Sequence, residues 1–243
     1  MTAAPDETLR LAAAHVVVDA AGLDGDGGPQ VEAADMRHLD RVLRLRPGEI
    51  VTATDGAGRW RSYRWRGGEV ELEPDGPVVN AASPTPSITV GFTPVKGDRP
   101  EWTVAKLTEL GVDTIIPLHT ARSVVRWSDD RASDHVGRLR RVAREATMQS
   151  RRCHIPQILD VASPSDVAGA AMAQFGGGPV SLDTPVVLIG PEGGWSPAEL
   201  DLGLEAVSLG PLVLRAETAA LAAAVLLTSL RHDAILTVRG RHQ

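Results

Sequence analysis

The sequence predicts an α/β domain with a largely parallel sheet, preceded by a smaller and mostly β domain. After residue 87, strand-like and helix-like patterns alternate repeatedly, as in a parallel sheet flanked by helices. Before residue 80, short strand candidates lie between glycine turns. The intervening residues, Asn-Ala-Ala-Ser-Pro-Thr-Pro-Ser, are small, polar and proline-rich, which is typical of a linker. We therefore expect domains at residues 1–82 and 83–243.

The first domain is expected to contain one helix followed by a small sheet. The helix spans residues 37–45 and is ended by Pro47-Gly48. Turns at Asp55-Gly-Ala-Gly and Gly67-Gly68 separate three short β-rich runs. The predicted strands are residues 49–54, 60–66 and 69–73.

The second domain is expected to alternate between strands and helices along its whole length. Each strand is predicted from a short apolar run, and residues 185–189 form the most apolar of these runs. Its predicted strands are residues 87–92, 114–118, 155–159, 185–189 and 206–209. Its predicted helices are residues 99–110, 130–150, a segment that begins at Ser165, and 217–230.

The composition excludes several classes of protein. The longest apolar run, residues 219–227, is nine residues, about half of what a membrane-spanning helix needs. The N-terminus lacks the basic start and apolar stretch of an export signal, and Cys153 is the one cysteine, so no internal disulfide is possible. We therefore expect a cytoplasmic protein without a membrane partner. His154 follows Cys153, but no other His or Cys lies at ligand spacing, so no metal site is expected.

Charge is distributed unevenly along the chain. The net charge is -6, yet residues 37–66 and 122–152 each carry +5, which leaves -16 for the remainder. Such segregation predicts a basic face that binds nucleic acid. The alternative is that these arginines lie on ordinary solvated helix faces.

A glycine-rich loop follows the most apolar strand. The loop, Gly190-Pro-Glu-Gly-Gly194, leads into a helix start in which Ser196 and Glu199 can form a capping box around Pro197. Ligands bind where parallel strands end, although a simple turn remains an alternative. No Gly-Lys-Ser/Thr follows, and Glu192 would repel a phosphate, so a nucleotide phosphate site is disfavoured.

A second loop, residues 209–218, joins a short strand to a helix that is apolar nearly all round. It reads Leu-Gly-Pro-Leu-Val-Leu-Arg-Ala-Glu-Thr. A helix of this kind is buried in a core or an interface. Arg215, Glu217 and Thr218 either compensate the helix dipole or belong to a site.

The two loops together resemble the RsmE family. The motif Ile-Gly-Pro-Glu-Gly-Gly is followed about fifteen residues later by Leu-Gly-Pro-x-x-Leu-Arg-x-Glu-Thr-Ala-Ala. The resemblance also covers segments that begin at His38, Lys96, Lys106, Arg122 and Gln149. The chain departs from the family at Leu212 and Ala216, where Arg and Thr are common.

Members of this family are SPOUT-superfamily enzymes that methylate N3 of a uridine in 16S ribosomal RNA of the small subunit. The resemblance implies a PUA-like RNA-binding domain, a SPOUT domain with a deep trefoil knot, and a homodimer. It also implies S-adenosyl-L-methionine as the cofactor. The residues expected to contact this cofactor are Ile189, Gly190, Pro191, Glu192, Gly193, Gly194, Leu209, Gly210, Leu214 and Thr218.

The expected catalytic residues are Arg215 and Glu217. N3 of uracil carries a proton at neutral pH, so methylation requires removal of that proton or stabilisation of the anion. Arg215 could stabilise the anion, and Glu217 could act as a base or position Arg215. The expected RNA contacts are Arg37, Arg41, Arg44, Arg122, Arg126 and Arg152.

Other readings remain open. Trp60, Tyr63 and Trp65 are candidates for stacking on RNA, or they pack in the core of the first domain. The chain could instead methylate another RNA position, such as a ribose 2′-oxygen of tRNA. It could also be a ribosome-associated RNA-binding factor without catalysis.

Overall fold

The computed structural model describes residues 5–67, 72–125, 127 and 129–234. The chain divides into two compact units. One consists of Met1–Ser83 and Arg144–Ile155, and the other of Pro84–Ala143 and Pro156–Gln243. A short segment from the middle part of the sequence therefore folds with the N-terminal residues.

The first unit contains a five-stranded sheet in the order β1-β2-β3-β4, with β5 paired to β3. β1 runs parallel to β2, and the other pairs are antiparallel. Strands β2 and β3 confirm the strands predicted at residues 49–54 and 60–66, whereas β1 was not predicted. The third predicted strand lies partly outside the described residues. The strands are β1 (Ala14–Val17), β2 (Ile50–Thr54), β3 (Arg59–Trp65), β4 (Leu72–Pro74) and β5 (Val79–Asn80).

The helical region before β2 differs from the predicted helix at residues 37–45. Helix α3 (Ala33–Arg37) begins earlier and continues into a π-helical turn, η1 (His38–Val42). Arg44 has φ 53°, a left-handed conformation that ends the helix before Leu45. Two further short helices are α1 (Pro5–Leu11) and α2 (Ala21–Asp24).

Segment 144–155 completes the first unit through hydrogen bonds to its sheet. Nε2 of His15 lies 2.9 Å from the carbonyl oxygen of Arg152, and Thr54 Oγ1 donates to the carbonyl oxygen of Cys153 at 3.0 Å. Arg144 Nη2 donates to Asp35 at 2.7 Å. The first two of these bonds satisfy buried polar side chains of β1 and β2, as buried groups require.

The second unit contains a six-stranded sheet in the order β11-β9-β10-β6-β7-β8. All of its strand pairs are parallel. The predicted α/β fold with a parallel sheet is therefore confirmed. The strands are β6 (Thr89–Phe92), β7 (Thr114–Pro117), β8 (Gln157–Ile158), β9 (Ala171–Pro179), β10 (Val186–Ile189) and β11 (Glu205–Ser208).

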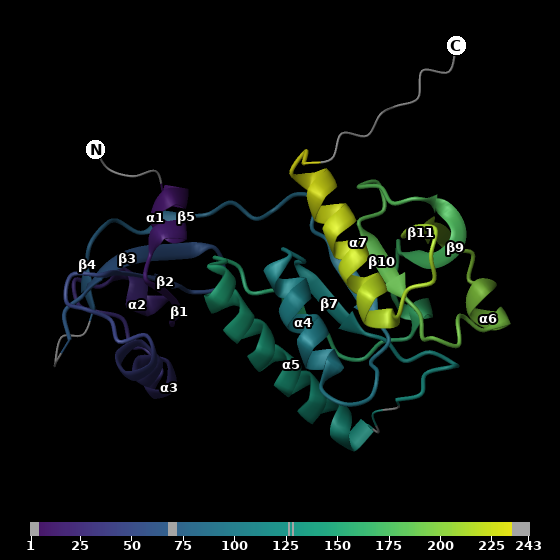
Figure 1. Cartoon of the computed structure of the whole chain (residues 1–243), viewed down its shortest axis with the longest axis horizontal. Coiled ribbons are helices and arrows are strands. Elements are labelled where there is room, and N and C mark those ends of the chain that lie inside the picture. The colour runs from purple at the N-terminus through teal and green to yellow at the C-terminus, as the bar shows by residue number, and fades with distance from the viewer. Residues whose placement is uncertain (1–4, 68–71, 126, 128, 235–243) are drawn as a thin grey trace, which may run out of the picture. The chain divides into compact units, whose positions relative to one another are not determined.

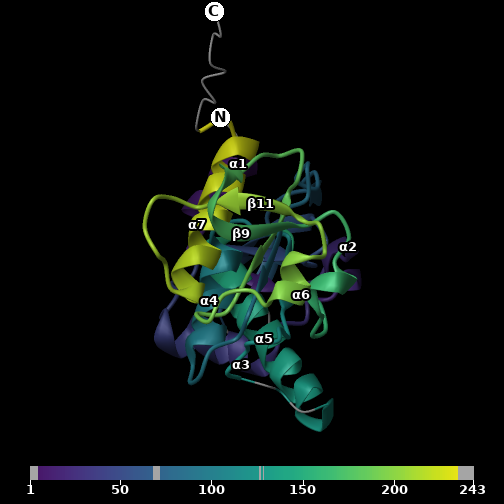
Figure 2. The same ribbon diagram turned by 90° about the vertical axis from the view of Figure 1, so that its right-hand side faces the viewer.

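Helices α4 (Arg99–Glu109) and α7 (Ala216–Arg231) pack together and bury one face of this sheet (Figure 1). Figure 2 shows β9 and β11 side by side, with α7 on one side and the short helix α6 (Pro197–Leu200) on the other. Helix α5 spans Asp129–Ser150. No helix in the described part of the chain combines the length and apolar character needed to cross a membrane.

The prediction of a helix that begins at Ser165 is wrong. Residues Pro164–Asp166 form a single 3-10 turn with a capping box, and the chain is extended as β9 from Ala171. Alanine in this segment favours a helix, but Gly169 and Gly176 adopt positive φ, which a helix cannot accommodate. Pairing with β10 and β11 then overrides the helical propensity of the alanines.

Candidate functional site

The predicted loop after β10 is held by a network of hydrogen bonds. Ser196 Oγ accepts from the Glu199 N–H at 3.3 Å, and the Ser196 N–H donates to Glu199 Oε2 at 2.7 Å, so the capping box is confirmed. The other carboxylate oxygen of Glu199 accepts from the Ala121 N–H at 2.8 Å. Burial alone would raise the pKa of Glu199, but the backbone N–H groups of Ser196 and Ala121 hold it below its usual value.

Side chains fix the middle of the same loop. Arg122 Nη1 donates to the carbonyl oxygen of Gly193 at 2.9 Å. Trp195 is buried, and its Nε1 donates to the carbonyl oxygen of Ala173 at 3.1 Å, which ties the loop to β9. Gly190 lies directly against the Trp195 ring. These contacts with Arg122 and Trp195 help to hold the main chain of this loop in place.

The loop between β11 and α7 presents apolar side chains to solvent. Leu212 is 74% exposed and Val213 is 93% exposed, while Leu209 and Leu214 pack partly against the core. Arg215 is the N-cap residue of α7 and its side chain makes no capping hydrogen bond. Apolar side chains exposed at a glycine-containing loop indicate a surface that a ligand can cover.

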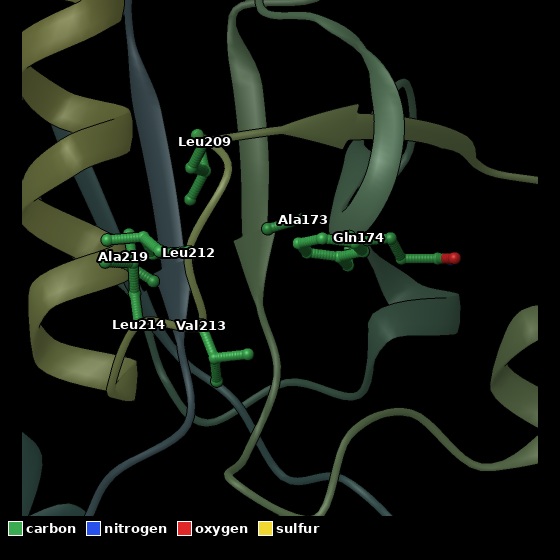
Figure 3. Close-up of a pocket in the computed structure, with 9 residues that line it drawn as sticks. Ala173, Gln174, Leu209, Leu212, Val213, Leu214 and Ala219 are labelled. Atoms are coloured by element: carbon green, nitrogen blue, oxygen red, sulfur yellow. The ribbon is translucent and has the colours of Figure 1, made fainter.

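Both loops line one cleft, which we call the loop cleft. It consists of two cavities of about 170 Å³ and 410 Å³ that share Ala173, Gln174, Phe175, Leu214 and Ala219. Figure 3 shows Leu209 and Val213 on one side of the smaller cavity, with Ala173 and Gln174 of β9 on the other. The larger cavity has a volume typical of a small-molecule site.

An irregularity in β9 shapes this cleft. Met172 pairs with Ala206, but the next pair joins Gly178 to Val207, so residues 173–177 leave the ladder. Ala173, Gln174 and Phe175 thereby become lining residues. Bulges of this kind often lie beside functional sites, where they direct side chains out of the sheet.

The chemistry of the cleft favours an uncharged ring joined to a cationic group. Its walls are mostly apolar side chains and main chain, and the acidic residue Glu192 is among the larger cavity's lining residues. A carboxylate attracts a cation and repels a phosphate. The geometry therefore agrees with the sequence argument against a phosphate site.

Comparison with known proteins identifies the family. The model of the RNA methyltransferase domain matches residues 82–228, more than half of the chain. The ribosomal RNA small subunit methyltransferase E of Mycobacterium tuberculosis is 33% identical over 227 residues, covering 82% of each chain. The chain belongs to the ribosomal RNA small subunit methyltransferase E family.

Solved structures of similar proteins agree with this family assignment. The methyltransferase E of Neisseria gonorrhoeae, crystallised with S-adenosyl methionine, is 26% identical, with a TM-score of 0.73 over 89% of this chain and 97% of that one. A probable rRNA methyltransferase from Porphyromonas gingivalis has the same identity and TM-score over 91% of this chain and 100% of that one.

The structure gathers most of the expected cofactor contacts around the loop cleft. The exceptions are Gly193, whose carbonyl oxygen accepts from Arg122, and Thr218, which is exposed in the first turn of α7; neither lines the cleft. The residues that do line it are Ile189, Gly190, Pro191, Glu192, Gly194, Leu209, Gly210 and Leu214.

The contribution of β9 to the cleft was not predicted from the sequence. Gln174 and Phe175 line both cavities, but they fall in the segment predicted to be a helix. The glycines at 176–178 were the available signal, because three consecutive glycines end a helix and permit a bulge.

The expected catalytic residues lie at the start of α7 but have different surroundings. Arg215 is exposed. Glu217 is largely buried, and its Oε1 lies 3.5 Å from Nη1 of Arg99 at the start of α4. Its Oε2 is buried and receives no hydrogen bond from the residues that the structure describes. An unsatisfied buried acceptor is costly, which makes this carboxylate a candidate for chemistry.

The arginines expected to contact RNA differ in how exposed their side chains are. Arg37, Arg41 and Arg44 are exposed in the first unit. Arg122 is exposed although it bonds to Gly193, whereas Arg152 is partly buried. Arg126 lies outside the described residues.

Ion pairs neutralise part of the two basic segments. The partners are acidic residues from elsewhere in the sequence, so the segregation of charge along the chain is smaller in space than in sequence. The pairs are Arg59 with Asp24, Arg64 with Asp75, Arg66 with Glu73, Arg138 with Glu101, Arg140 with Asp160, and Arg144 with Glu32 and Asp35.

The aromatic residues of the first unit do not contact solvent. Trp60, Tyr63 and Trp65 are at most 3% exposed. The suggestion that they stack on RNA is therefore wrong, and the alternative, core packing, is confirmed. Tyr63 and Trp65 lie two residues apart on one face of β3 and share a core cluster, whereas Trp60 lies on the other face and packs with Leu9 and Cys153.

Proposed function

We propose that this protein uses S-adenosyl-L-methionine to methylate N3 of a specific uridine in 16S ribosomal RNA of the small subunit. The single observation that carries the proposal is that the two family motifs, far apart in sequence, line one loop cleft. The family membership supplies the reaction class, and the Neisseria gonorrhoeae relative binds S-adenosyl methionine.

The loop cleft fits this cofactor. Apolar residues such as Leu209, Leu214 and Ala219 suit the adenine ring, and main-chain groups of residues 190–194 can bond to polar parts of the ligand. Glu192 would lie near positive charge. Bound there, the cofactor would supply an electrophilic methyl group on a sulfonium.

Two residues of α7 would carry the chemistry on the RNA side. The Arg215 guanidinium would stabilise negative charge that develops on the uracil oxygens. Glu217 would accept the N3 proton, since its Oε2 has no partner among the described residues. Its contact with Arg99 keeps a positive charge beside the carboxylate.

The domain roles follow from the same proposal. Residues 1–82 would form a PUA-like RNA-binding domain, which the exposed arginines Arg37, Arg41 and Arg44 support. Residues 83–243 would form a SPOUT domain with a deep trefoil knot, supported by a parallel sheet in which β9 lies between β10 and β11.

The proposal also covers the oligomeric state and the cellular location of the protein. We infer a homodimer from α7, a helix rich in apolar residues that leaves Val225 42% exposed. The proposed setting is the cytoplasm, where small ribosomal subunits are found. Arg122, Arg126 and Arg152 would add RNA contacts from the second basic segment.

The test is methyl transfer to small ribosomal subunits that lack the modification. With labelled S-adenosyl-L-methionine, we expect label in 3-methyluridine after digestion of the RNA to nucleosides. Label in a 2′-O-methylated nucleoside would favour the alternative reaction on a ribose. No label together with no cofactor binding in calorimetry would favour the non-catalytic RNA-binding factor, for which the departures at Leu212 and Ala216 are the motivating observation.

A further inference from the structure

A separate cavity of about 360 Å³ borders the glycine-rich loop. Pro191 and Glu192 form part of its wall and also part of the wall of the loop cleft. The two spaces are therefore neighbours that share these two lining residues. The remaining lining residues are Thr93, Pro94, Val95, Lys96, Arg99 and Val124.

This cavity combines cationic donors with apolar walls. Lys96 and Arg99 are exposed at its surface, whereas Thr93 and Pro94 are buried. Val124 is 69% exposed and widens the apolar surface. An apolar space with a few directed donors is suited to a flat, polar ring.

Arg99 connects the cavity to the proposed proton acceptor. It lines the cavity and also lies 3.5 Å from Glu217 Oε1. The buried Oε2 of the same carboxylate has no hydrogen bond from a described residue. The cavity thus has two cations at its wall, and one of them contacts a carboxylate that could take a proton from a bound ring.

We propose that this cavity binds the target uracil base, with Lys96 and Arg99 donating to its two carbonyl oxygens, whose second acceptor positions remain open to the Arg215 guanidinium. The inference rests on the proposed function and deepens it by naming the base subsite. Uracil carries oxygens on both sides of N3, and loss of the N3 proton spreads negative charge over both. Donors at these oxygens therefore stabilise the reacting anion more than the neutral base.

The proposed methyl transfer to N3 accounts for every bond and for the proton. The N3–H bond breaks and its proton passes to the Glu217 carboxylate. The new N3–C bond forms as the C–S bond breaks, and the electron pair of that bond stays on sulfur. A base in this cavity must first leave its stack in the RNA, as targets of base-modifying enzymes do.

A phosphate group is a poorer occupant. Lys96 and Arg99 would attract it, but Glu192 lines the same cavity and Glu217 is paired with Arg99. A base presents carbonyl oxygens to the cations without placing a full negative charge beside two carboxylates.

The test uses full-length protein with Lys96→Ala or Arg99→Ala, and Lys106→Ala as a control. Lys106 lies on α4 and pairs with Glu109. For the first two variants we expect kcat/KM for uridine methylation to fall by about tenfold or more, as loss of a donor to a developing anion does. Cofactor affinity in calorimetry should stay within about twofold, because neither residue lines the loop cleft.

A second measurement does not depend on turnover. Protein saturated with S-adenosylhomocysteine is titrated with uridine and with cytidine, and binding is followed by ligand-detected NMR. Uridine should bind, and cytidine should bind at least about fivefold more weakly, because its amino group faces the donors that suit a carbonyl. Lys96→Ala should weaken uridine binding.

The outcomes separate this inference from the proposed function. Unchanged methylation in both variants, an equal loss of cofactor affinity, or no preference for uridine would overturn the uracil subsite while methylation by the unsubstituted protein still stands. Failure of the unsubstituted protein to methylate small subunits would refute the proposed function. Uridine binding would then still decide whether the cavity accepts the base, and absence of that binding would overturn the inference.

Discussion

A Cβ atom placed on Gly190 would lie 2.9 Å from Cε2 of the Trp195 ring. The glycine therefore allows the buried indole to pack against the main chain where β10 ends. The same indole bonds to the carbonyl oxygen of Ala173. Packing at Gly190 thus couples the glycine-rich loop to the bulged part of β9, and both line the loop cleft.

Gly190→Ala should weaken cofactor binding by about tenfold, because overpacking costs about 1–3 kcal/mol and here displaces Trp195. Calorimetry with S-adenosyl-L-methionine measures the change. Gly137→Ala is the matched control, since Gly137 lies within α5 and an added Cβ meets nothing within 4 Å. The control should bind normally and gain about 0.5–1 kcal/mol in stability. Normal binding by Gly190→Ala would refute the role of this packing.

Arg215→Ala should lower kcat for methylation by about 100-fold or more while cofactor affinity stays nearly unchanged, because the side chain acts on charge in the transition state. The residue is exposed and makes no capping bond, so the substitution should not unfold the protein. Arg215→Lys retains the charge but loses the planar fork, and we expect intermediate activity. Full activity of the alanine variant would end the catalytic assignment.

Replacing Arg37, Arg41 and Arg44 together with alanine should weaken RNA binding and its dependence on salt. If each arginine neutralises one phosphate, the slope of log affinity against log salt should become shallower by about 2 to 3. Arg66→Ala is the control, because Arg66 is already paired with Glu73. Filter binding to small subunits over a range of salt concentrations provides the measurement. An unchanged slope in the triple variant would place the RNA contacts elsewhere.

His15 should make the first unit less stable in mild acid. Burial lowers the pKa of His15 to about 4, although the hydrogen bond with the Arg152 carbonyl opposes the shift. With Nε2 donating to that carbonyl, Nδ1 accepts from Thr52 Oγ1 at 2.8 Å, so the folded protein holds the neutral ring. The unfolded chain, with a pKa of 6.5, binds the extra proton first.

The stabilisation from His15 is therefore present above pH 6.5 and is lost as the pH falls toward 4. Between pH 7.5 and 5 the free energy of unfolding should fall by about 2 kcal/mol through this residue. Denaturant titrations of the original protein and of His15→Gln isolate the effect, because glutamine does not titrate. An equal loss in both proteins would show that other groups cause it.

Sequence patterns predicted elements where local chemistry is decisive. The α6 capping box needs only Ser196, Pro197 and Glu199, and the short apolar run at residues 186–189 is typical of a buried strand beside other strands. Such features depend on near neighbours in the chain. They were visible without knowledge of the fold.

Features that depend on distant residues were not visible. The extended conformation of β9 comes from pairing with β10 and β11, while its alanines alone favour a helix. The contact between Arg99 and Glu217 joins residues 118 positions apart. The ion pairs that neutralise the arginine-rich segments likewise bring in carboxylates from outside them, which a running charge sum cannot show.

The most direct test of the account is the site of methylation itself. Small ribosomal subunits lacking the modification are incubated with the protein and S-adenosyl-L-methionine, and the 16S RNA is cut into fragments for mass spectrometry. We predict one added methyl group in one fragment, located on the base of a uridine and released as 3-methyluridine. A methyl group on a ribose, on several unrelated fragments, or on none would contradict the account.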